Sequence, residues 1–238
     1  MDLDVSNQGE RILETDNAKM VRSHRERYHL IRRYLKPNDR VLDCATGTGY
    51  GAALLAKHCG SVDGVDLSDV AIKFARDNYH AKNLRFQVGS AYQLPFADST
   101  FDVFCSIETI EHVDKPDQLV KEAIRVLKPG GLFIVSTPNR VISNLKSQER
   151  PANPFHLFEW SFLEMRDFLA RHFSNVTYWG QRVRSRNKFH LPYVLSKMNR
   201  WVKRPDFVPV SADDTRARAM ETWESWQPEN FIAVCKRA

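Results

Sequence analysis

Apolar positions along the chain alternate between two spacings, one typical of buried strands and the other of amphipathic helices. Five short apolar runs have the length of buried strands, at 40–45, 61–66, 84–88, 101–107 and 132–137. Between them, apolar residues recur at helical spacing over 50–58, 69–79 and 116–127. Because strand and helix follow each other in strict alternation, the pattern predicts a parallel sheet with helices on both faces.

The pattern continues on both sides of this central block. Before it, large side chains at helical spacing predict a helix that Pro37 ends: Met20, His24, Tyr28, Ile31 and Leu35. After it, Ser161 and Glu164 form a capping box that opens another helix. Two further strands are predicted at 175–180 and 230–235, which brings the sheet to seven strands. The connection between them is too long for an ordinary loop, so we expect an insertion at 181–229.

The strand at 40–45 ends in a glycine-rich turn, Gly47-Thr48-Gly49-Tyr50-Gly51, from which a helix begins. Glycines let the backbone turn sharply and approach a ligand closely, and a helix N-terminus presents unpaired N–H groups. Asp66 ends the next strand, at the spacing where a carboxylate commonly binds a ribose diol. The turn therefore predicts a site for an adenosine-containing cofactor. Since its spacing also fits the dinucleotide-binding pattern, the turn alone leaves a nicotinamide cofactor open.

The composition narrows the class of protein. With 238 residues, of which 42% are hydrophobic, the chain is long enough for one domain with a full core. No apolar run reaches the roughly 20 residues that span a bilayer, and the N-terminal segment has no signal-peptide core. The four cysteines have neither metal nor redox spacing, so we expect buried thiols in a cytoplasmic protein.

Several motifs follow the glycine turn in a fixed order. They are Leu94-Pro95-Phe96, Phe101-Asp102, Glu111-His112-Val113 and Leu127-Lys128-Pro129-Gly130-Gly131. Their order and spacing resemble class I S-adenosylmethionine-dependent methyltransferases, most closely the O-methyltransferase type of ubiquinone biosynthesis. The resemblance runs from 25 to 173, with a last strand at 231–235. It implies a Rossmann-like, doubly wound, mainly parallel seven-stranded sheet with an insertion before the last strand, and S-adenosylmethionine as the methyl donor.

The resemblance also assigns the residues that hold the sugar and the amino-acid end of the donor. It places Asp43 and Gly47 at the methionine ammonium and carboxylate, with Gly49 allowing a close backbone approach. Asp66 would accept hydrogen bonds from both ribose hydroxyls, and Leu67 beside it would also contact the donor.

Four more positions belong to the same implied site. Ser90 and Ala91 would border the adenine, and Ile107 would contribute backbone near the amino-acid end. Two of the positions depart from the family pattern. Ala45 replaces the first glycine, where we expect that a small side chain suffices, and Ser90 replaces an acid that commonly binds the adenine amino group.

A block rich in acids and histidine follows the fourth strand. If 108–112 forms a helical turn, Glu108, Glu111 and His112 share one face. This block, together with His156 ahead of Phe158-Glu159-Trp160-Ser161, resembles small-RNA 3′-terminal ribose 2′-O-methyltransferases, in which the matching residues hold a divalent ion.

The resemblance implies a set of four metal ligands: Glu108, Glu111, His112 and His156. Two carboxylates and two imidazoles suit Mn²⁺ or Zn²⁺, with Mg²⁺ as a further candidate. Two other interpretations stay open. Acids at the start of a helix are favourable through the helix dipole alone, and without an ion His112 or His156 would act as the general base.

The insertion carries much of the basic excess behind the net charge of +6. Apolar and basic residues separate onto different faces of a helix predicted at 191–204. Three uses stay open for it: a lid over the acceptor, peripheral contact with an anionic membrane surface, and contact with phosphates of a nucleotide-sugar, a lipid or RNA. We expect a single methyltransferase domain over 1–238, divided into a lead-in and helix (1–36), a cofactor-binding core (37–180), the insertion (181–229) and the last strand (230–238).

These features predict an S-adenosylmethionine-dependent O-methyltransferase acting on a hydroxylated small molecule, a sugar or a lipid-linked intermediate. Three other functions stay open: an RNA methyltransferase acting on ribose or base, a catalytically silent partner subunit with the same fold, and a dehydrogenase. The sequence does not indicate the acceptor or the oligomeric state.

Overall fold

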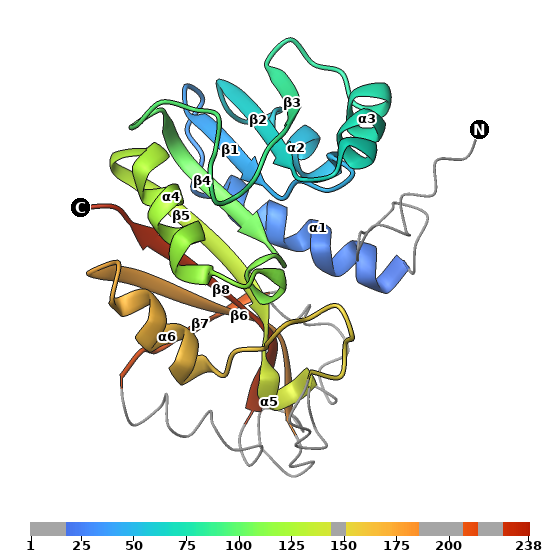
Figure 1. The fold of residues 1–238 in the computed structure, drawn as a ribbon. Helices are drawn as coiled ribbons and strands as arrows, with labels where there is room; N and C mark the ends of the chain where they lie inside the picture. The colour runs from blue at the N-terminus through green and yellow to red at the C-terminus, as the bar shows by residue number, and fades with distance from the viewer. Residues whose placement is uncertain (1–17, 144–150, 186–206, 214–225) are drawn as a thin grey trace.

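The structure, a computed structural model, describes residues 18–143, 151–185, 207–213 and 226–238. Its centre is one sheet of eight strands in the order β3-β2-β1-β4-β5-β8-β6-β7 (Figure 1). No helix within these ranges is long and apolar enough to cross a membrane.

Five parallel strands form the part of the sheet that the hydrophobic pattern predicts. They are β1 (Arg40–Cys44), β2 (Ser61–Asp66), β3 (Leu84–Val88), β4 (Phe101–Ile107) and β5 (Leu127–Pro138). β1 pairs in parallel with both β2 and β4, so the chain changes direction across the sheet at β1. This arrangement places the carboxyl ends of the central strands at one edge, where open α/β sheets bind ligands.

The other three strands make the sheet mixed. β8 (Trp226–Lys236) runs antiparallel to both β5 and β6 (Asn175–Ser185), and β7 (Phe207–Val210) runs antiparallel to β6. The prediction of seven mainly parallel strands is therefore wrong in number, because β7 lies within the segment predicted as an insertion. β7 has only four residues and contains Pro209, and proline within a sheet is largely confined to edge strands, so the hydrophobic pattern did not predict a strand there.

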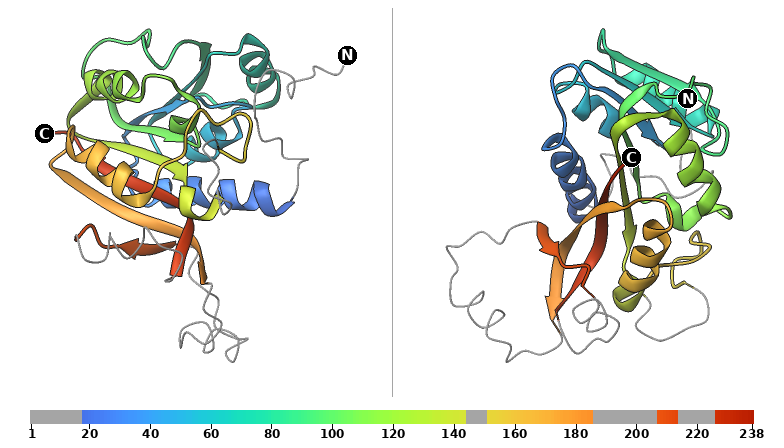
Figure 2. Two further views of the ribbon diagram at one scale, coloured as in Figure 1. Left: turned by 60° about the horizontal axis from the view of Figure 1, so that its bottom comes forward. Right: turned by 90° about the vertical axis from the view of Figure 1, so that its left-hand side faces the viewer.

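Helices cover both faces of the sheet, as predicted. α1 (Ala18–Arg32), α2 (Tyr50–Leu55) and α3 (Asp69–Asn78) pack on one face, in a core with Ile134 and Ile232. α4 (Pro116–Val126) and α6 (Phe162–Ala170) pack on the other, in a core with Phe104 and Phe231. The right-hand view of Figure 2 shows α1 on one side of the sheet and α4 and α6 on the opposite side. The doubly wound arrangement is confirmed.

Local signals set where these helices begin. The Ser68 side chain accepts a hydrogen bond from the backbone N–H of Ala71 at the start of α3, and Pro116 occupies the first turn of α4. Ser161 and Glu164 form both hydrogen bonds of the predicted capping box. Two short helices complete the described elements: η2 (Ile110–His112), a single 3₁₀ turn after β4, and α5 (Arg140–Ser143) after β5.

Candidate active site

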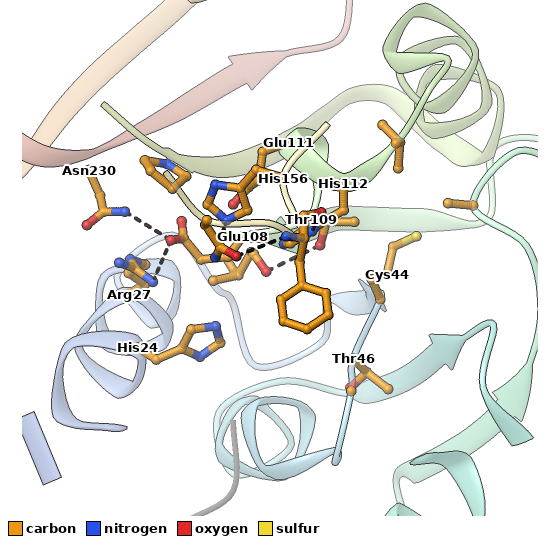
Figure 3. Close-up of a pocket in the computed structure, with 18 of the residues that line it drawn as sticks. His24, Arg27, Cys44, Thr46, Glu108, Thr109, Glu111, His112, His156 and Asn230 are labelled. Atoms are coloured by element: carbon orange, nitrogen blue, oxygen red, sulfur yellow. Dashed lines mark hydrogen bonds and ion pairs between the residues drawn. The ribbon is translucent and has the colours of Figure 1, made fainter. Parts of the chain in front are cut away.

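A pocket of about 1210 Å³ lies at the carboxyl ends of β1, β2 and β4. Its walls come from the turn after β1, the end of β2, the segment around η2, the loop before α6 and the face of α1. Figure 3 shows the part of the pocket between α1 and η2. Most residues predicted to bind a donor line it: Ala45, Gly47, Asp66, Leu67, Ser90, Ala91 and Ile107.

The turn between β1 and α2 uses its two glycines for different purposes. Both have positive φ angles, 56° at Gly47 and 85° at Gly49. A Cβ on Gly47 would meet no atom within 4 Å, whereas a Cβ on Gly49 would lie 2.6 Å from the Ala75 Cβ. Gly49 is not among the residues that line the pocket, and its role in allowing a close backbone approach to the donor stays a prediction. Its lack of a side chain lets the turn pack against α3.

Ala45, which replaces the first glycine of the family pattern, has a φ of 58°. This is the left-handed region, which costs a residue with a Cβ roughly 1–2 kcal/mol. The expectation that the position needs only a small side chain is therefore incomplete, because it also needs a left-handed backbone.

Asp66 is placed as predicted, with its carboxylate at the edge of the pocket. One carboxylate oxygen accepts the Gly47 N–H at 2.9 Å, and the other accepts the Ser68 N–H at 2.9 Å. These bonds join the ends of β1 and β2 and fix the carboxylate beside the glycine turn. A ribose diol can reach it there as a hydrogen-bond donor.

Asp43, in contrast, lies beneath the turn and does not line the pocket. Its carboxylate accepts hydrogen bonds from the Thr46 hydroxyl at 2.6 Å, the Cys105 thiol at 3.3 Å and the Tyr28 hydroxyl at 3.3 Å. Burial raises its pKa from 3.8 to about 6, although these three hydrogen bonds act in the opposite direction. Direct contact of Asp43 with the methionine end stays a prediction, and in this structure its carboxylate contacts the Tyr28 side chain of α1.

Sequence reasoning missed the contribution of α1 to the pocket. His24, Arg27 and Tyr28 all line it, and the rings of His24, Tyr28 and Tyr50 lie 5.6–5.8 Å apart. Burial, followed by the charge of Arg27, holds the pKa of His24 well below its usual range. The sequence did contain a signal for this contribution, because His24 and Arg27 lie near Tyr28 in the predicted helix.

Glu108 has a left-handed backbone, with a φ of 51°. Its carboxylate accepts hydrogen bonds from the Ser136 hydroxyl at 2.8 Å and the Asn230 amide at 2.9 Å, and pairs with Arg27 at 3.4 Å. Figure 3 shows the contacts of Glu108 with Arg27 and Asn230 on the α1 side of the pocket. The expected helical turn begins only at Ile110, so Glu108 does not share a helical face with Glu111.

The structure brings three of the four predicted metal ligands together. Glu111, His112 and His156 each offer a ligand atom, and these atoms lie within 4.8 Å of one another. The two imidazole rings are 4.8 Å apart between centroids and nearly perpendicular. Glu108 is not part of this cluster, because its side chain is held by Arg27 and Asn230.

Glu111 is fully buried, and neither of its carboxylate oxygens has a hydrogen-bond partner within the described ranges. Burial, followed by the charge of Glu108, raises its pKa well above the usual value. A buried carboxylate without a hydrogen-bond partner lowers the stability of the fold. Because Glu111 has no such partner among the described residues and lies close to two imidazoles, it is a candidate ligand for a bound cation.

Part of the predicted acceptor region cannot be placed. The basic helix at 191–204 falls outside the described residues, as does most of the insertion. Of the residues at its two ends, Arg182 and Glu229 line the pocket.

Sequence comparison finds a family match in the parallel part of the sheet. Residues 42–135 match the family model described as a methyltransferase domain. This segment is similar to S-adenosylmethionine-dependent methyltransferases. The matched range holds Gly47, Asp66 and the Glu111-His112 pair.

Individual proteins that are similar in sequence to this chain carry methyltransferase names. The chain is 37% identical over 129 residues to a Mycolicibacterium smegmatis protein named a probable S-adenosylmethionine-dependent methyltransferase, an alignment that covers 54% of this chain and 49% of that protein. It is 32% identical over 151 residues to a ubiquinone/menaquinone biosynthesis C-methyltransferase of Geotalea daltonii, covering 59% and 60% of the two chains. The chain thus spans about half the length of the curated relatives it matches first.

Solved structures share the fold at lower sequence identity. The YcgJ protein from Bacillus subtilis superposes with a TM-score of 0.59 at 20% identity, covering 90% of this chain and all of that one. The [4+2]-cyclase SpnF superposes with a TM-score of 0.60 at 19% identity, covering 88% and 79%. Since one of these structures is of a cyclase, the fold by itself does not identify the reaction.

Proposed function

We propose that this domain transfers a methyl group from S-adenosylmethionine to a hydroxyl oxygen of a small molecule, a sugar or a lipid-linked intermediate, with a divalent ion at the acceptor end. One observation carries the proposal. A single pocket is bounded by the glycine turn with Asp66 and also by Glu111, His112 and His156.

The donor end fits an adenosine-containing sulfonium compound. Asp66 would accept hydrogen bonds from the ribose hydroxyls, Gly47 would face the amino-acid end, and Leu67, Ser90 and Ala91 would border the adenine. The donor supplies an already activated methyl group. The protein then has to exclude water and hold the acceptor oxygen in line with it, which is worth up to roughly 7–11 kcal/mol of the barrier.

The acceptor end fits a divalent cation. Glu111, His112 and His156 would hold it, because a buried carboxylate without partners and two imidazoles form a donor set for Mn²⁺ or Zn²⁺, with Mg²⁺ as a weaker match. A bound ion would lower the pKa of an acceptor hydroxyl and orient it. If no ion binds, His156 is the better general base, because Glu159 accepts a hydrogen bond from its other ring nitrogen at 2.7 Å.

The alternatives differ in what supports them. The C-methyltransferase name of the Geotalea relative favours a carbon acceptor as the second candidate, and the atom methylated in the product distinguishes the two. The basic segment at 191–204, which would contact the phosphates of an RNA acceptor, lies outside the described residues. A catalytically silent partner is disfavoured because Gly47 and Asp66, which we propose bind the donor, are both present and line the pocket.

Calorimetric titration with S-adenosylmethionine, with and without Mn²⁺, Mg²⁺ and EDTA, tests the proposal when followed by a screen of hydroxylated acceptors. We expect donor binding without metal and turnover only with metal. Glu111→Ala and His156→Ala should abolish the metal effect and leave the donor affinity within about twofold of wild type, a free-energy change below about 0.5 kcal/mol. Full turnover in both variants would refute the metal, and absence of donor binding would refute the whole proposal.

A further inference from the structure

Glu159 lies behind His156 and has no assigned role. It precedes α6, next to Trp160, which forms a β-bridge with Asn139. Its side chain is only 1% exposed, and that of His156 is 8% exposed. One Glu159 oxygen lies 2.7 Å from His156 Nδ1, and the other accepts a hydrogen bond from the Ser143 hydroxyl of α5. A nearly fully buried carboxylate is thus held between a serine and a candidate ligand.

The hydrogen bonds around His156 define its tautomer. Asn153 accepts the Phe155 N–H through its side-chain oxygen at 3.0 Å, so its amide nitrogen is the atom that faces His156 Nε2, also at 3.0 Å. An amide nitrogen only donates, and Nε2 must therefore carry the lone pair. The ring proton is then on Nδ1 and is donated to Glu159.

His112 has the same arrangement with a different acceptor. Its Nδ1 lies 2.9 Å from the backbone carbonyl oxygen of Phe155, which can only accept a hydrogen bond. The proton of His112 is therefore also on Nδ1. In both imidazoles Nε2 carries the lone pair, which on His156 accepts the Asn153 amide N–H. Both rings lie close to the Glu111 carboxylate, for which no hydrogen-bond partner is found among the described residues.

We propose that Glu159 is a positioning residue that holds His156 as the Nδ1–H tautomer, so that its Nε2 can become a ligand to the ion shared with Glu111 and His112. The ion would take the place of the Asn153 amide N–H at Nε2. Carboxylates that accept the second N–H of a ligating histidine fix its orientation and raise its basicity. The inference rests on the proposed function, since it assigns a role toward the proposed ion. It adds Ser143 as the residue that orients the Glu159 carboxylate.

Two variants and one control test the inference. Glu159→Gln keeps an acceptor oxygen but removes the charge, and Glu159→Ala removes both. Asp117→Asn is the matched control, because Asp117 also pairs with an imidazole, His172, at 2.9 Å, but does not line the pocket. Affinity for S-adenosylmethionine reports that each variant is folded.

The first measurement is the tautomer of His156 in metal-free protein, from long-range ¹H–¹⁵N NMR correlations. We expect the Nδ1–H form in wild type, in Asp117→Asn and in Glu159→Gln. In Glu159→Ala we expect a measurable fraction of the Nε2–H form, because only the Asn153 amide then still favours Nδ1–H. The second is Mn²⁺ affinity by electron paramagnetic resonance. We expect it to fall about 10- to 100-fold in Glu159→Ala, less in Glu159→Gln, and not in the control.

An unchanged tautomer and an unchanged Mn²⁺ affinity in Glu159→Ala would overturn the inference. Another result would refute the ion of the proposed function without refuting the role of Glu159. If wild type binds no Mn²⁺ while the tautomer still depends on Glu159, the ion is refuted and the positioning of His156 by Glu159 is supported.

Discussion

At the scale of a single residue, Asp43 has contacts to distant parts of the chain that its sequence motif does not indicate. It lies next to the last residue of β1, and its buried carboxylate accepts hydrogen bonds from Thr46, Cys105 and Tyr28. Such a residue shapes the glycine turn from below. Its raised pKa makes its contribution to stability depend on pH.

Asp43→Asn should remove a pH-dependent cost of folding. A carboxyl group whose pKa is 3.8 in the unfolded chain and about 6 in the folded one destabilises the fold increasingly as pH rises through this window. At about 1.4 kcal/mol per pH unit, the full difference is about 3 kcal/mol. The free energy of unfolding of the variant minus that of wild type, from urea titrations, should rise by this amount between pH 3.5 and pH 7.

Asp102→Asn is the control with the opposite sign. Partial burial raises the pKa of Asp102, but the Arg40 backbone N–H and the Lys128 ammonium lower it below the usual value. Wild type therefore gains stability from Asp102 as pH rises, and loses it below about pH 4. Parallel pH curves for wild type and Asp43→Asn would contradict the burial of an ionisable Asp43.

At the scale of elements, the glycine turn and α1 form the site together. The turn gives the pocket its backbone N–H groups, while α1 supplies His24, Arg27 and Tyr28. Periodicity predicted both elements and their order. It could not show that α1 crosses the carboxyl edge of the sheet, because that contact joins α1 to β1 and β4 through tertiary packing.

The two glycines of the turn should respond differently to alanine. Gly49→Ala places a Cβ 2.6 Å from Ala75, in addition to its φ of 85°, so we expect a loss of more than about 3 kcal/mol in the free energy of unfolding. Gly47→Ala meets no atom and should cost about 1–2 kcal/mol from backbone strain alone. Its added methyl group faces the pocket, so the S-adenosylmethionine affinity should fall as well.

Urea titrations and calorimetry on both variants separate these effects. The Gly47→Ala variant reports the cost of the backbone conformation without a clash and is therefore the control for Gly49→Ala. Equal stability of the two variants would show that the turn does not pack on α3 as described.

At the scale of the whole molecule, binding of the donor should be linked to folding through Asp66. This carboxylate connects the ends of β1 and β2 and also faces the pocket. A ligand present at 100 times its dissociation constant stabilises the folded state by about 2.7 kcal/mol. The demethylated donor, S-adenosylhomocysteine, should give this stabilisation to wild type in urea titrations.

Asp66→Asn should lose most of this stabilisation at the same ligand concentration, since an amide presents one acceptor oxygen where the ribose diol needs two. Asp63→Asn is the matched control on the same strand. Asp63 pairs with Arg40 at 3.2 Å away from the pocket, so the variant should keep the wild-type response. An equal response in both variants would contradict the placement of the ribose at Asp66.

The residues of the predicted site fall into two groups, according to whether the predicted sheet alone was enough to bring them together. Gly47, Asp66 and Ile107 lie at strand ends, and parallel pairing brings strand ends together without further knowledge of the fold. His156 comes from a loop far along the chain, and only the family resemblance linked it to Glu111. The failure for Glu108 arose because its backbone is left-handed, which spacing along a helix does not predict.

The sequence by itself determined the strands β1 to β4, the helices between them, their caps and the adenosine-type turn, because each depends on residues close together in the chain. The tertiary structure alone decided the eighth strand, the burial of Asp43, the separation of Glu108 from the Glu111 cluster and the contact between Glu159 and His156. These depend on which side chains meet across different elements. Local periodicity sets the faces of helices and strands, whereas contacts between distant residues are set by how those faces pack.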